Sequence, residues 1–377
     1  MKVLHVAETA KGGVRGYLEE LVPHQLSVFG QHNVRVVLPA DHMNGASTIP
    51  DDAIHAVQGD ASRLVRTWRV LQATLQQLRC WQPDLVHLHS TFAGAALRPL
   101  LVARLDRPRI VYCAHGWAFD RAQRSPANVV IGAVERTLAL CSDAIVCVSE
   151  HDRLRALGVG IGESRLVQIN HGINDLTDDE AGVSAAAALW PPGKIKVLFV
   201  GRLDRQKGAD ILCEALAQLH DTHHAIVIGE GVVSRSGSAL QLPPNAQCVG
   251  WIPRGEIDAY MRAADVVVMP SRWEAFGLVA IEAMRAGCAV VATRVGGLPE
   301  VVQHDVTGLL VPTDDAPALA LALAQRSAPQ LHALGAAGRK RFERLFRADR
   351  MLDRTQALYR SLVPASIAPN EEALPER

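Results

Sequence analysis

Residues 264–300 read ADVVVMPSRWEAFGLVAIEAMRAGCAVVATRVGGLPE and contain a strand, a helix and a second strand in succession. Val266–Met269 is short, apolar and β-branched, which predicts a buried strand. A polar loop follows, and Gly277 precedes a run of helical composition from Leu278 to Ala286. Val290–Ala292 is the next buried strand. This order is typical of a parallel sheet with helices packed on its faces.

Two glutamates belong to this unit. Glu274 lies in the loop after the first strand, and Glu282 lies about one turn into the helix. Ligands of parallel sheets bind beyond the carboxyl ends of the strands, so Glu274 and the free amides around Gly277 and Leu278 are expected at a ligand site. Helix N-termini suit phosphate. A carboxylate beside phosphate-binding amides indicates that a further group, such as sugar hydroxyls, is bound as well.

With seven residues between them, Glu274 and Glu282 resemble the paired-glutamate signature of family-four retaining glycosyltransferases. These enzymes have the GT-B fold and use nucleotide-sugar donors. The resemblance implies that Glu274 is a catalytic-site residue holding hydroxyls of the sugar ring. It further implies that Glu282 holds the ribose hydroxyls and that the amides of Gly277 and Leu278 hold the diphosphate. A Glu-rich loop and an ordinary helix-surface glutamate are the alternative.

A second donor-binding loop is predicted after the strand Ile195–Val200. It carries Arg202 and Lys207, which are expected to converge beside a helix N-terminus. Arginine as a bidentate fork and lysine as a point charge form a clamp for a diphosphate. The pair also resembles the Gly-Arg…Lys-Gly motif of the same family, whereas the alternative is two solvated basic side chains.

Two glycine turns further along are weaker candidates. Gly229-Glu230-Gly231 begins a near match to the dinucleotide fingerprint, but the acid that would bind a ribose is absent after the next strand, where Ile252 follows Trp251. In the resembled family the first loop, with Gly231, lines the donor pocket, and the second, with Ile252, contacts the base through backbone atoms. Sheet turns without a ligand explain both loops equally well.

The first 170 residues offer two further candidates. After the strand Val3–Ala7, Gly12 and Gly13 allow close approach of a ligand without forming a dinucleotide fingerprint. The resemblance implies that this glycine pair faces the donor phosphate or the acceptor, with Gly13 the better candidate, and a tight turn is the alternative. His115 follows the strand Arg109–Ala114. The resemblance places it beside the transferred sugar as a catalytic-site hydrogen-bond donor or electrostatic group.

No metal site or cofactor is predicted. His87 and His89 share one face of a strand, but no carboxylate or cysteine in the sequence is placed to complete a site. No D-x-D triplet occurs, which fits the metal-independent habit of the resembled family. Arg202, Lys207 and helix amides would stabilise the leaving diphosphate instead.

Composition limits the partners. The 377 residues include 39 basic and 39 acidic side chains, so no overall field favours nucleic acid. Seven scattered cysteines, a first strand in place of a signal peptide and the lack of a long uncharged apolar run favour a cytoplasmic protein. Residues 60–125 hold ten Arg, no Lys and four Asp, including a helix over 63–81. Either that helix face is solvated or the region contacts anionic lipid or an acceptor diphosphate, peripherally on the inner face of the membrane.

The expected fold is α/β of the GT-B type, with two Rossmann-like doubly wound domains facing a central cleft. Residues 1–175 would form the acceptor domain, 176–194 a linker and 195–345 the donor domain. Residues 346–363 would form a helix that crosses back to the first domain, and 364–377 a disordered tail.

The expected function is transfer of a sugar, with retention, from a nucleoside diphosphate sugar to a hydroxyl acceptor. A UDP-sugar is favoured over a GDP-sugar. Surface polysaccharide or glycolipid biosynthesis, with a lipid-diphosphate-linked acceptor, is the expected setting. A nucleotide-sugar epimerase of the same fold is one alternative and would act on the donor alone. A non-catalytic nucleotide-sugar-binding module is another and would form a complex without turnover.

Overall fold

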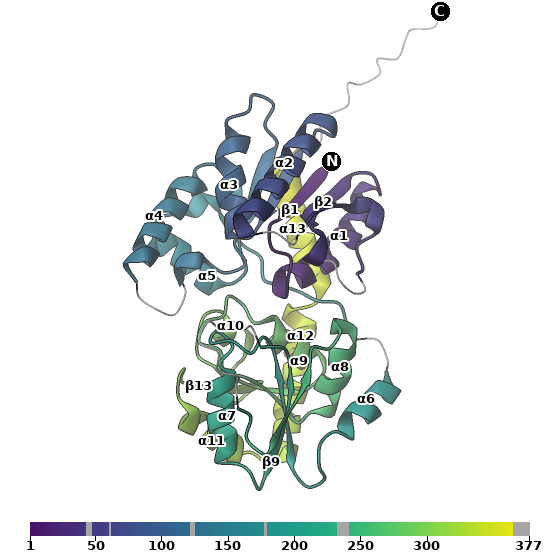
Figure 1. The fold of residues 1–377 in the computed structure, drawn as a ribbon, viewed down its shortest axis with the longest axis vertical. Coiled ribbons are helices and arrows are strands. Elements are labelled where there is room, and N and C mark those ends of the chain that lie inside the picture. Colours follow the sequence, from purple (N-terminus) through teal and green to yellow (C-terminus); the bar gives the residue numbers. More distant parts are fainter. Residues whose placement is uncertain (43–46, 60–61, 121–124, 177–178, 232–240, 365–377) are drawn as a thin grey trace, which may run out of the picture.

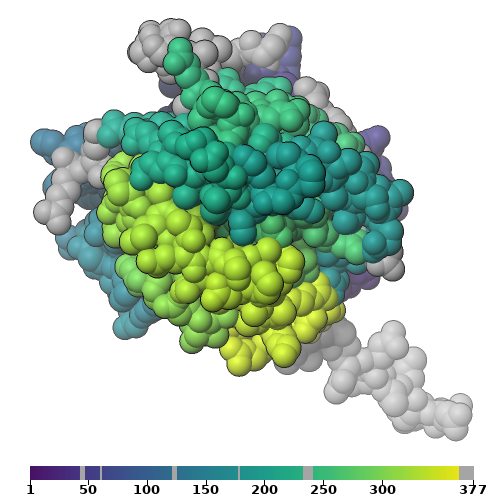
Figure 2. Space-filling view, turned by 90° about the horizontal axis from the view of Figure 1, so that it is seen from below, coloured from purple at the N-terminus to yellow at the C-terminus, as the bar shows by residue number. Residues whose placement is uncertain are grey.

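The computed structural model describes residues 1–42, 47–59, 62–120, 125–176, 179–231 and 241–364, and contains two α/β domains, one above the other in Figure 1. We call the part built on strands β1–β7 the N-domain and the part built on β8–β13 the C-domain. The view in Figure 2, from below, shows that this end of the molecule is covered mainly by segments of the C-domain.

The N-domain contains a seven-stranded parallel sheet in the order β3-β2-β1-β4-β5-β6-β7. Its strands are β1 Val3–Ala7, β2 Val34–Pro39, β3 Ile54–Val57, β4 Leu85–His89, β5 Arg109–Cys113, β6 Ala144–Cys147 and β7 Leu166–Gln168. Its helices are α1 Gly13–Phe29, α2 Arg63–Cys80, α3 Thr91–Val102, α4 Pro126–Ala139 and α5 Glu150–Gly158. The strand order reverses between β1 and β4, which is where sheets of this type bind ligands.

The C-domain contains a six-stranded parallel sheet in the order β10-β9-β8-β11-β12-β13, which reverses between β8 and β11. Its strands are β8 Ile195–Val200, β9 His223–Ile228, β10 Ala246–Gly250, β11 Val266–Met269, β12 Ala289–Thr293 and β13 Gly308–Val311. Its helices are α7 Ala209–Ala217, α8 Arg254–Ala263, α9 Leu278–Arg285, α10 Leu298–Val301, α11 Ala316–Ala324 and α12 Ala328–Leu345. The fold expected from the sequence, two doubly wound α/β domains, is confirmed.

The central strands carry the cores. All residues of β1, β4, β11 and β12 are buried. Parallel strands covered by helices on both faces need apolar side chains in both directions, and this explains the continuous apolar runs in the sequence. The polar exceptions are Thr293 at the end of β12 and three histidines on β1 and β4, and all four are buried.

The chain passes between the domains at two adjacent places. Ile173 N–H donates to Phe346 O over 3.0 Å, and Ala348 N–H donates to Ile173 O over 2.9 Å. After the second passage, helix α13 (Ala348–Leu362) lies in the upper part of the molecule with the N-domain (Figure 1). There the Tyr359 hydroxyl lies 2.5 Å from His87 Nδ1.

Part of the expected linker 176–194 is helical, because α6 (Glu180–Ala187) is capped by Asp179, whose carboxylate accepts from Gly182 N–H at 2.9 Å. This helix packs against α8. The expected tail 364–377 lies, except for Pro364, outside the described residues.

Part of the local excess of arginine in residues 60–125 is compensated by acids from outside that window. Arg66 donates to Glu8 at 2.8 Å, buried Arg98 donates to Glu135 at 2.6 Å, and Arg107 donates to Asp143 at 3.0 Å. The count of charges in a sequence window therefore overstates the basic character of this surface. Among the described helices, none combines the length and apolarity needed to cross a membrane.

The Arg98–Glu135 pair gives a stability prediction. Arg98→Met should lower the free energy of unfolding by about 3–5 kcal/mol, because it leaves the buried Glu135 carboxylate without its cation. Adding Glu135→Leu should recover much of that loss. The matched control Arg104→Met, which breaks the exposed Arg104–Asp106 pair, should cost less than about 1 kcal/mol. Urea unfolding followed by circular dichroism measures all three, and equal losses in Arg98→Met and Arg104→Met would contradict the prediction.

Candidate active site

The two loops at the strand reversal of the C-domain meet through an ion pair. Lys207 lies in the loop after β8, and Glu274 lies in the loop after β11. Lys207 Nζ donates to Glu274 Oε2 over 2.5 Å, with both side chains mostly buried. The main chain of Lys207 is fixed as well, since its N–H donates to Asp204 Oδ1 over 3.0 Å. The sequence therefore identified two residues that the fold brings into contact at the expected edge of the sheet.

Glycines set the position of Glu274. Gly296 has φ +54°, and a Cβ there would lie 1.6 Å from Glu274 O. The next residue, Gly297, donates its N–H to the same carbonyl over 3.2 Å. Gly208 has φ +69°, and a Cβ there would lie 2.0 Å from Pro270 O, before the Glu274 loop. The loops after β8, β11 and β12 thus touch through backbone atoms, a packing that side chains would prevent.

Helix α9 begins at Leu278, directly beside the ion pair. Its N-cap Gly277 has φ +102° and provides no side-chain cap for the first amides. Gly13 of the N-domain faces this helix, because a Cβ on Gly13 would lie 3.1 Å from Leu278 Cδ1. A Cβ on Gly12 would meet no atom within 4 Å. Gly13 of the N-domain and Gly277, the N-cap of α9, therefore lie at the same helix N-terminus. A helix N-terminus is suited to an anion.

Glu282 is held by an arginine that the sequence did not identify. Arg254 Nη2 donates to Glu282 Oε1 over 3.0 Å, and Arg254 Nη1 lies 3.6 Å from Glu19 Oε2 of helix α1. Burial by itself lowers the pKa of Arg254, but the carboxylates of Glu282, Glu20 and Glu19 outweigh that effect and raise the pKa. A cation at the first position of helix α8 opposes the helix dipole, and this was the available signal.

Arg202 is not part of this contact. Its side chain is 59% exposed, and Nη2 donates to Gln206 Oε1 over 2.7 Å and lies 3.0 Å from Asp204 Oδ2. Gly231 is near it, since Leu203 and Gly231 form a parallel bridge and a Cβ on Gly231 would meet open space. Ile252 is buried and directly precedes Pro253, the N-cap of α8. Joint use of Arg202 and Lys207 would need the Arg202 side chain to leave Asp204.

His115 comes from the N-domain to the same place. It follows β5 with φ +52°, an uncommon conformation for a residue with a side chain. A Cβ on the next residue, Gly116, would lie 3.0 Å from Ala275 Cβ, adjacent to Glu274. Burial lowers the pKa of His115 to about 3, so the imidazole is neutral near pH 7. A neutral imidazole can act on a ligand through hydrogen bonds, which is one of the two roles considered from the sequence.

Behind His115 lies a group of buried histidines. The parallel register of β1 and β4 pairs His5 with His87, so His5 joins the two histidines seen on β4 in the sequence. Ligand atoms of His5, His87 and His89 lie within 4.8 Å of one another, a spacing that could hold a metal ion. In this structure His5 Nδ1 and His89 Nε2 are instead 3.0 Å apart, at hydrogen-bond distance. The sequence showed only the two histidines of β4, because the pairing of His5 with β4 depends on register, which one strand does not reveal.

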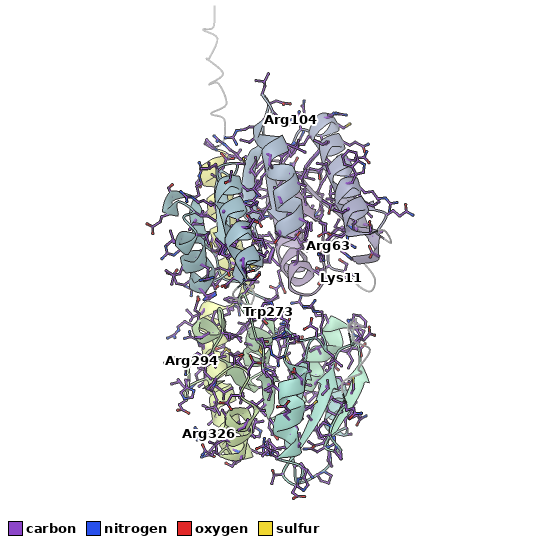
Figure 3. All side chains as sticks on the ribbon, turned by 60° about the vertical axis from the view of Figure 1, so that its left-hand side comes forward. Lys11, Arg63, Arg104, Trp273, Arg294 and Arg326 are labelled. Carbon is purple, nitrogen blue, oxygen red and sulfur yellow. The ribbon has the colours of Figure 1, made fainter. Side chains whose placement is uncertain are left out.

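The domain edges that carry these residues face each other. Lys11 and Arg63 lie at the lower edge of the N-domain in Figure 3, and Trp273, which precedes Glu274, lies at the upper edge of the C-domain. Direct contacts hold the edges together: Ser149 Oγ donates to Ala275 O over 2.8 Å. Glu300 accepts from the N–H groups of Glu150 and His151 at 2.8 and 2.7 Å.

Comparisons with known proteins agree with this architecture. Residues 11–175 match the family described as Glycosyltransferase Family 4, and residues 184–341 match the family described as Glycosyl transferases group 1. A 41.2 kDa protein of the cps region of Klebsiella pneumoniae is 29% identical over 324 residues, which cover 84% of this chain and 87% of that protein. A D-inositol 3-phosphate glycosyltransferase of Mycolicibacterium gilvum is 34% identical over 264 residues, and the match covers 64% of this chain but only 58% of that relative.

Solved structures resemble the whole chain. Sucrose-phosphate synthase of Thermosynechococcus elongatus superposes with a TM-score of 0.79 at 25% identity, covering 97% of this chain and 100% of that one. HepE of Anabaena, solved in complex with UDP-glucose, gives a TM-score of 0.79 at 20% identity, covering 96% and 100%. These neighbours have the GT-B fold.

The backbone contact at Gly296 gives a prediction with an internal control. Gly296→Ala should cost more than about 3 kcal/mol of stability, because strain at positive φ adds to a clash with Glu274 O. Gly287→Ala shares the positive φ, +71°, but its Cβ meets open space, so it should cost only about 1–2 kcal/mol. Thermal and urea unfolding measure the difference. Similar losses in both variants would mean that backbone strain alone acts at Gly296.

Proposed function

The chain belongs to the family-four glycosyltransferases and has the GT-B fold, and we propose that it transfers a sugar, with retention of anomeric configuration, from a UDP-sugar to a hydroxyl acceptor. The observation that carries this proposal is the Lys207–Glu274 ion pair, which lies at the strand reversal of the C-domain beside the N-terminus of α9. Lysine and free helix amides suit a diphosphate, whereas a carboxylate suits sugar hydroxyls. The HepE structures, solved with UDP-glucose and with UDP, support the choice of base.

In the proposed complex the donor lies between the two domains. Its diphosphate takes Lys207 and the amides of Gly277 and Leu278, and Arg202 turns from Asp204 to join them. Glu274 then exchanges part of its contact with Lys207 for hydroxyls of the sugar ring. Glu282, oriented by Arg254, accepts from the ribose hydroxyls, while Gly231 and Ile252 line the nucleotide end.

The proposed chemistry is stabilisation of the leaving group. As the bond from the anomeric carbon to the diphosphate oxygen breaks, negative charge grows on that oxygen, and Lys207, Arg202 and the α9 amides neutralise it in place. Because these groups supply the positive field, we propose a reaction that is independent of added metal. The acceptor hydroxyl attacks from the face that the diphosphate leaves, and the departing phosphate oxygen takes its proton. Glu274 and His115 orient the sugar during this step.

For the acceptor, we propose a saccharide on a lipid diphosphate, in surface polysaccharide or glycolipid biosynthesis. The relative in the Klebsiella cps region and the structural neighbour WaaG, described as involved in lipopolysaccharide biosynthesis, support this setting. Helix α4, on the outer side of the N-domain (Figure 1), exposes Val129, Val130 and Val134. Because these three side chains are exposed together on α4, we propose a peripheral membrane contact that depends on them more than on charge.

The Lys207–Glu274 ion pair predicts that substitutions of its two residues have different effects on UDP binding. Lys207→Met should weaken UDP binding about 10- to 100-fold, because a charge-assisted contact to phosphate is lost. Glu274→Gln should leave UDP binding unchanged or stronger, since it frees Lys207, but should lower turnover at least about 100-fold. Calorimetry with UDP, with and without EDTA, and release of UDP from UDP-glucose measure the two effects.

Matched controls for these variants are Lys340→Met and Glu256→Gln, which change exposed residues on α12 and α8. Both should behave as the wild type, and EDTA should change none of the binding constants. Wild-type affinity for UDP in Lys207→Met would remove the proposed diphosphate site. Weaker UDP binding in Glu274→Gln would show that the carboxylate holds the nucleotide and not the sugar.

The membrane contact is tested separately. Wild-type protein should sediment with vesicles of 70% phosphatidylcholine and 30% phosphatidylglycerol, and 0.5 M NaCl should reduce the bound fraction only slightly. Val130→Glu should abolish binding by adding a charge to the apolar face of α4. The control Leu321→Glu changes an equally exposed apolar residue on α11 of the C-domain and should bind like the wild type. Binding that is lost in 0.5 M NaCl would instead indicate a contact dominated by charge.

A further inference from the structure

A continuous series of hydrogen-bond contacts leads from helix α1 to His115. Gln25 Oε1 lies 2.7 Å from His5 Nε2, and His5 Nδ1 lies 3.0 Å from His89 Nε2. His89 Nδ1 in turn lies 3.0 Å from His115 Nε2. The first three residues are buried, and each histidine in the series uses one ring nitrogen toward each neighbour. We call Gln25, His5, His89 and His115 the histidine series.

All three imidazoles are neutral near pH 7. Burial lowers the pKa of His5 to about 4, against the opposing effect of its hydrogen bond to Gln25. Burial, followed by the neighbouring histidines, lowers the pKa of His89 well below its usual value. Burial lowers the pKa of His115 to about 3. A neutral imidazole has one N–H donor and one lone pair, so every contact in the series has a direction.

The direction starts at Gln25. Its Oε1 can only accept, so His5 carries the proton on Nε2 and presents a lone pair at Nδ1. His89 must then donate from Nε2, which leaves its Nδ1 as a lone pair. His115 must donate from Nε2 to that lone pair, and its own Nδ1 is left unprotonated. The opposite orientation of the Gln25 amide would reverse every step.

We propose that Gln25, His5 and His89 are positioning residues that fix His115 as the Nε2–H tautomer, so that His115 offers Nδ1 to the ligand as a hydrogen-bond acceptor. Nδ1 is buried and has no hydrogen-bond partner among the described residues, so a bound ligand can supply its only partner. The ring is held in place by Tyr17, edge-on at 5.0 Å between centroids, and by His171, stacked at 5.6 Å.

The tautomer restricts what His115 can recognise. An acceptor nitrogen pairs with a hydroxyl or N–H of the bound sugar and repels a carboxylate or phosphate oxygen. This consequence rests on the proposed function, since it places the sugar at His115. The tautomer itself does not depend on that function, because every contact that sets it lies within the protein.

A buried metal ion is the competing explanation for the same histidines. An ion bound by His5, His87 and His89 would use lone pairs that now serve the hydrogen bond between His5 and His89. Metal binding would therefore break the series and release His115 from the tautomer assigned above. The two explanations predict different protonation of the same nitrogen atoms.

Two-bond ¹H–¹⁵N correlation spectra of the full chain, with histidine labelled by ¹⁵N and no ligand added, test the proposal at pH 7. His115 should show the Nε2–H pattern, and so should His5 and His89. Assignment uses the loss of signals in single substitutions of each histidine. A His115 ring protonated on Nδ1, a doubly protonated ring, or metal-shifted nitrogens together with one equivalent of bound zinc would each overturn the proposal.

Two variants of the neighbour separate positioning from packing. His89→Leu keeps much of the volume but removes the acceptor, so His115 should become a mixture of tautomers and release of UDP from UDP-glucose should slow at least 10-fold. His89→Asn can place an amide oxygen near the original Nδ1 and should restore the Nε2–H form and most of the rate. Gln25→Met, which removes the first acceptor, should also give a mixture. An unchanged His115 spectrum in His89→Leu would show that the series does not set the tautomer.

Affinity for UDP serves as the separate readout of the proposed function. It should remain within about 3-fold of the wild-type value in His89→Leu, because Lys207 and α9 are intact. If the wild-type protein fails to bind UDP, the proposed function is wrong while the spectra still decide the tautomer. If UDP binds normally but the spectra show Nδ1–H on His115, the tautomer proposal is wrong while the proposed function stands.

Discussion

Parallel pairing of every strand is the constraint on which the rest of this structure depends. It brings all loops that follow strands to one edge of each sheet, and the two edges face each other across the domain boundary. Lys207 and Glu274 are 67 residues apart, yet they share a hydrogen bond because β8 and β11 are neighbours. In the N-domain the same constraint pairs His5 with His87. The contacts of the site are therefore consequences of strand order more than of local sequence.

This constraint explains which features the sequence could predict. Continuous apolar runs bounded by glycine and proline predicted the buried strands. The loops after them predicted Glu274 and Lys207 at the ligand edge of the C-domain sheet and His115 at that of the N-domain sheet. Those inferences need only local pattern and the general geometry of parallel sheets. The glycine pair at 12–13 was expected to face a ligand, with a tight turn as the alternative, whereas the approach of Gly13 to Leu278 is visible only in the fold.

What the sequence could not supply depends on register and on contacts between distant segments. The third histidine, His5, required the pairing of β1 with β4. The orientation of Glu282 by Arg254, and of Arg254 by Glu19, required knowledge of how α8 lies against α1. The arginine count in residues 60–125 overstated the basic character of the surface for the same reason. The partner acids Glu8, Glu135 and Asp143 lie outside that window. Counting charges in a segment describes its composition, whereas the charge of a surface also depends on side chains that are distant in the sequence.

Helix α13 has a consequence for the order in which the molecule can be completed during synthesis. Tyr359 contacts His87, which lies 272 positions earlier in the chain, so a residue that follows the whole C-domain packs against β4 of the N-domain. During synthesis, nearly the whole C-domain therefore leaves the ribosome before helix α13, which packs on the N-domain, has been made. His87 can form its contact with the Tyr359 hydroxyl only after the C-domain has been synthesised. The N-domain is synthesised first, but its packing is complete only when α13 is added.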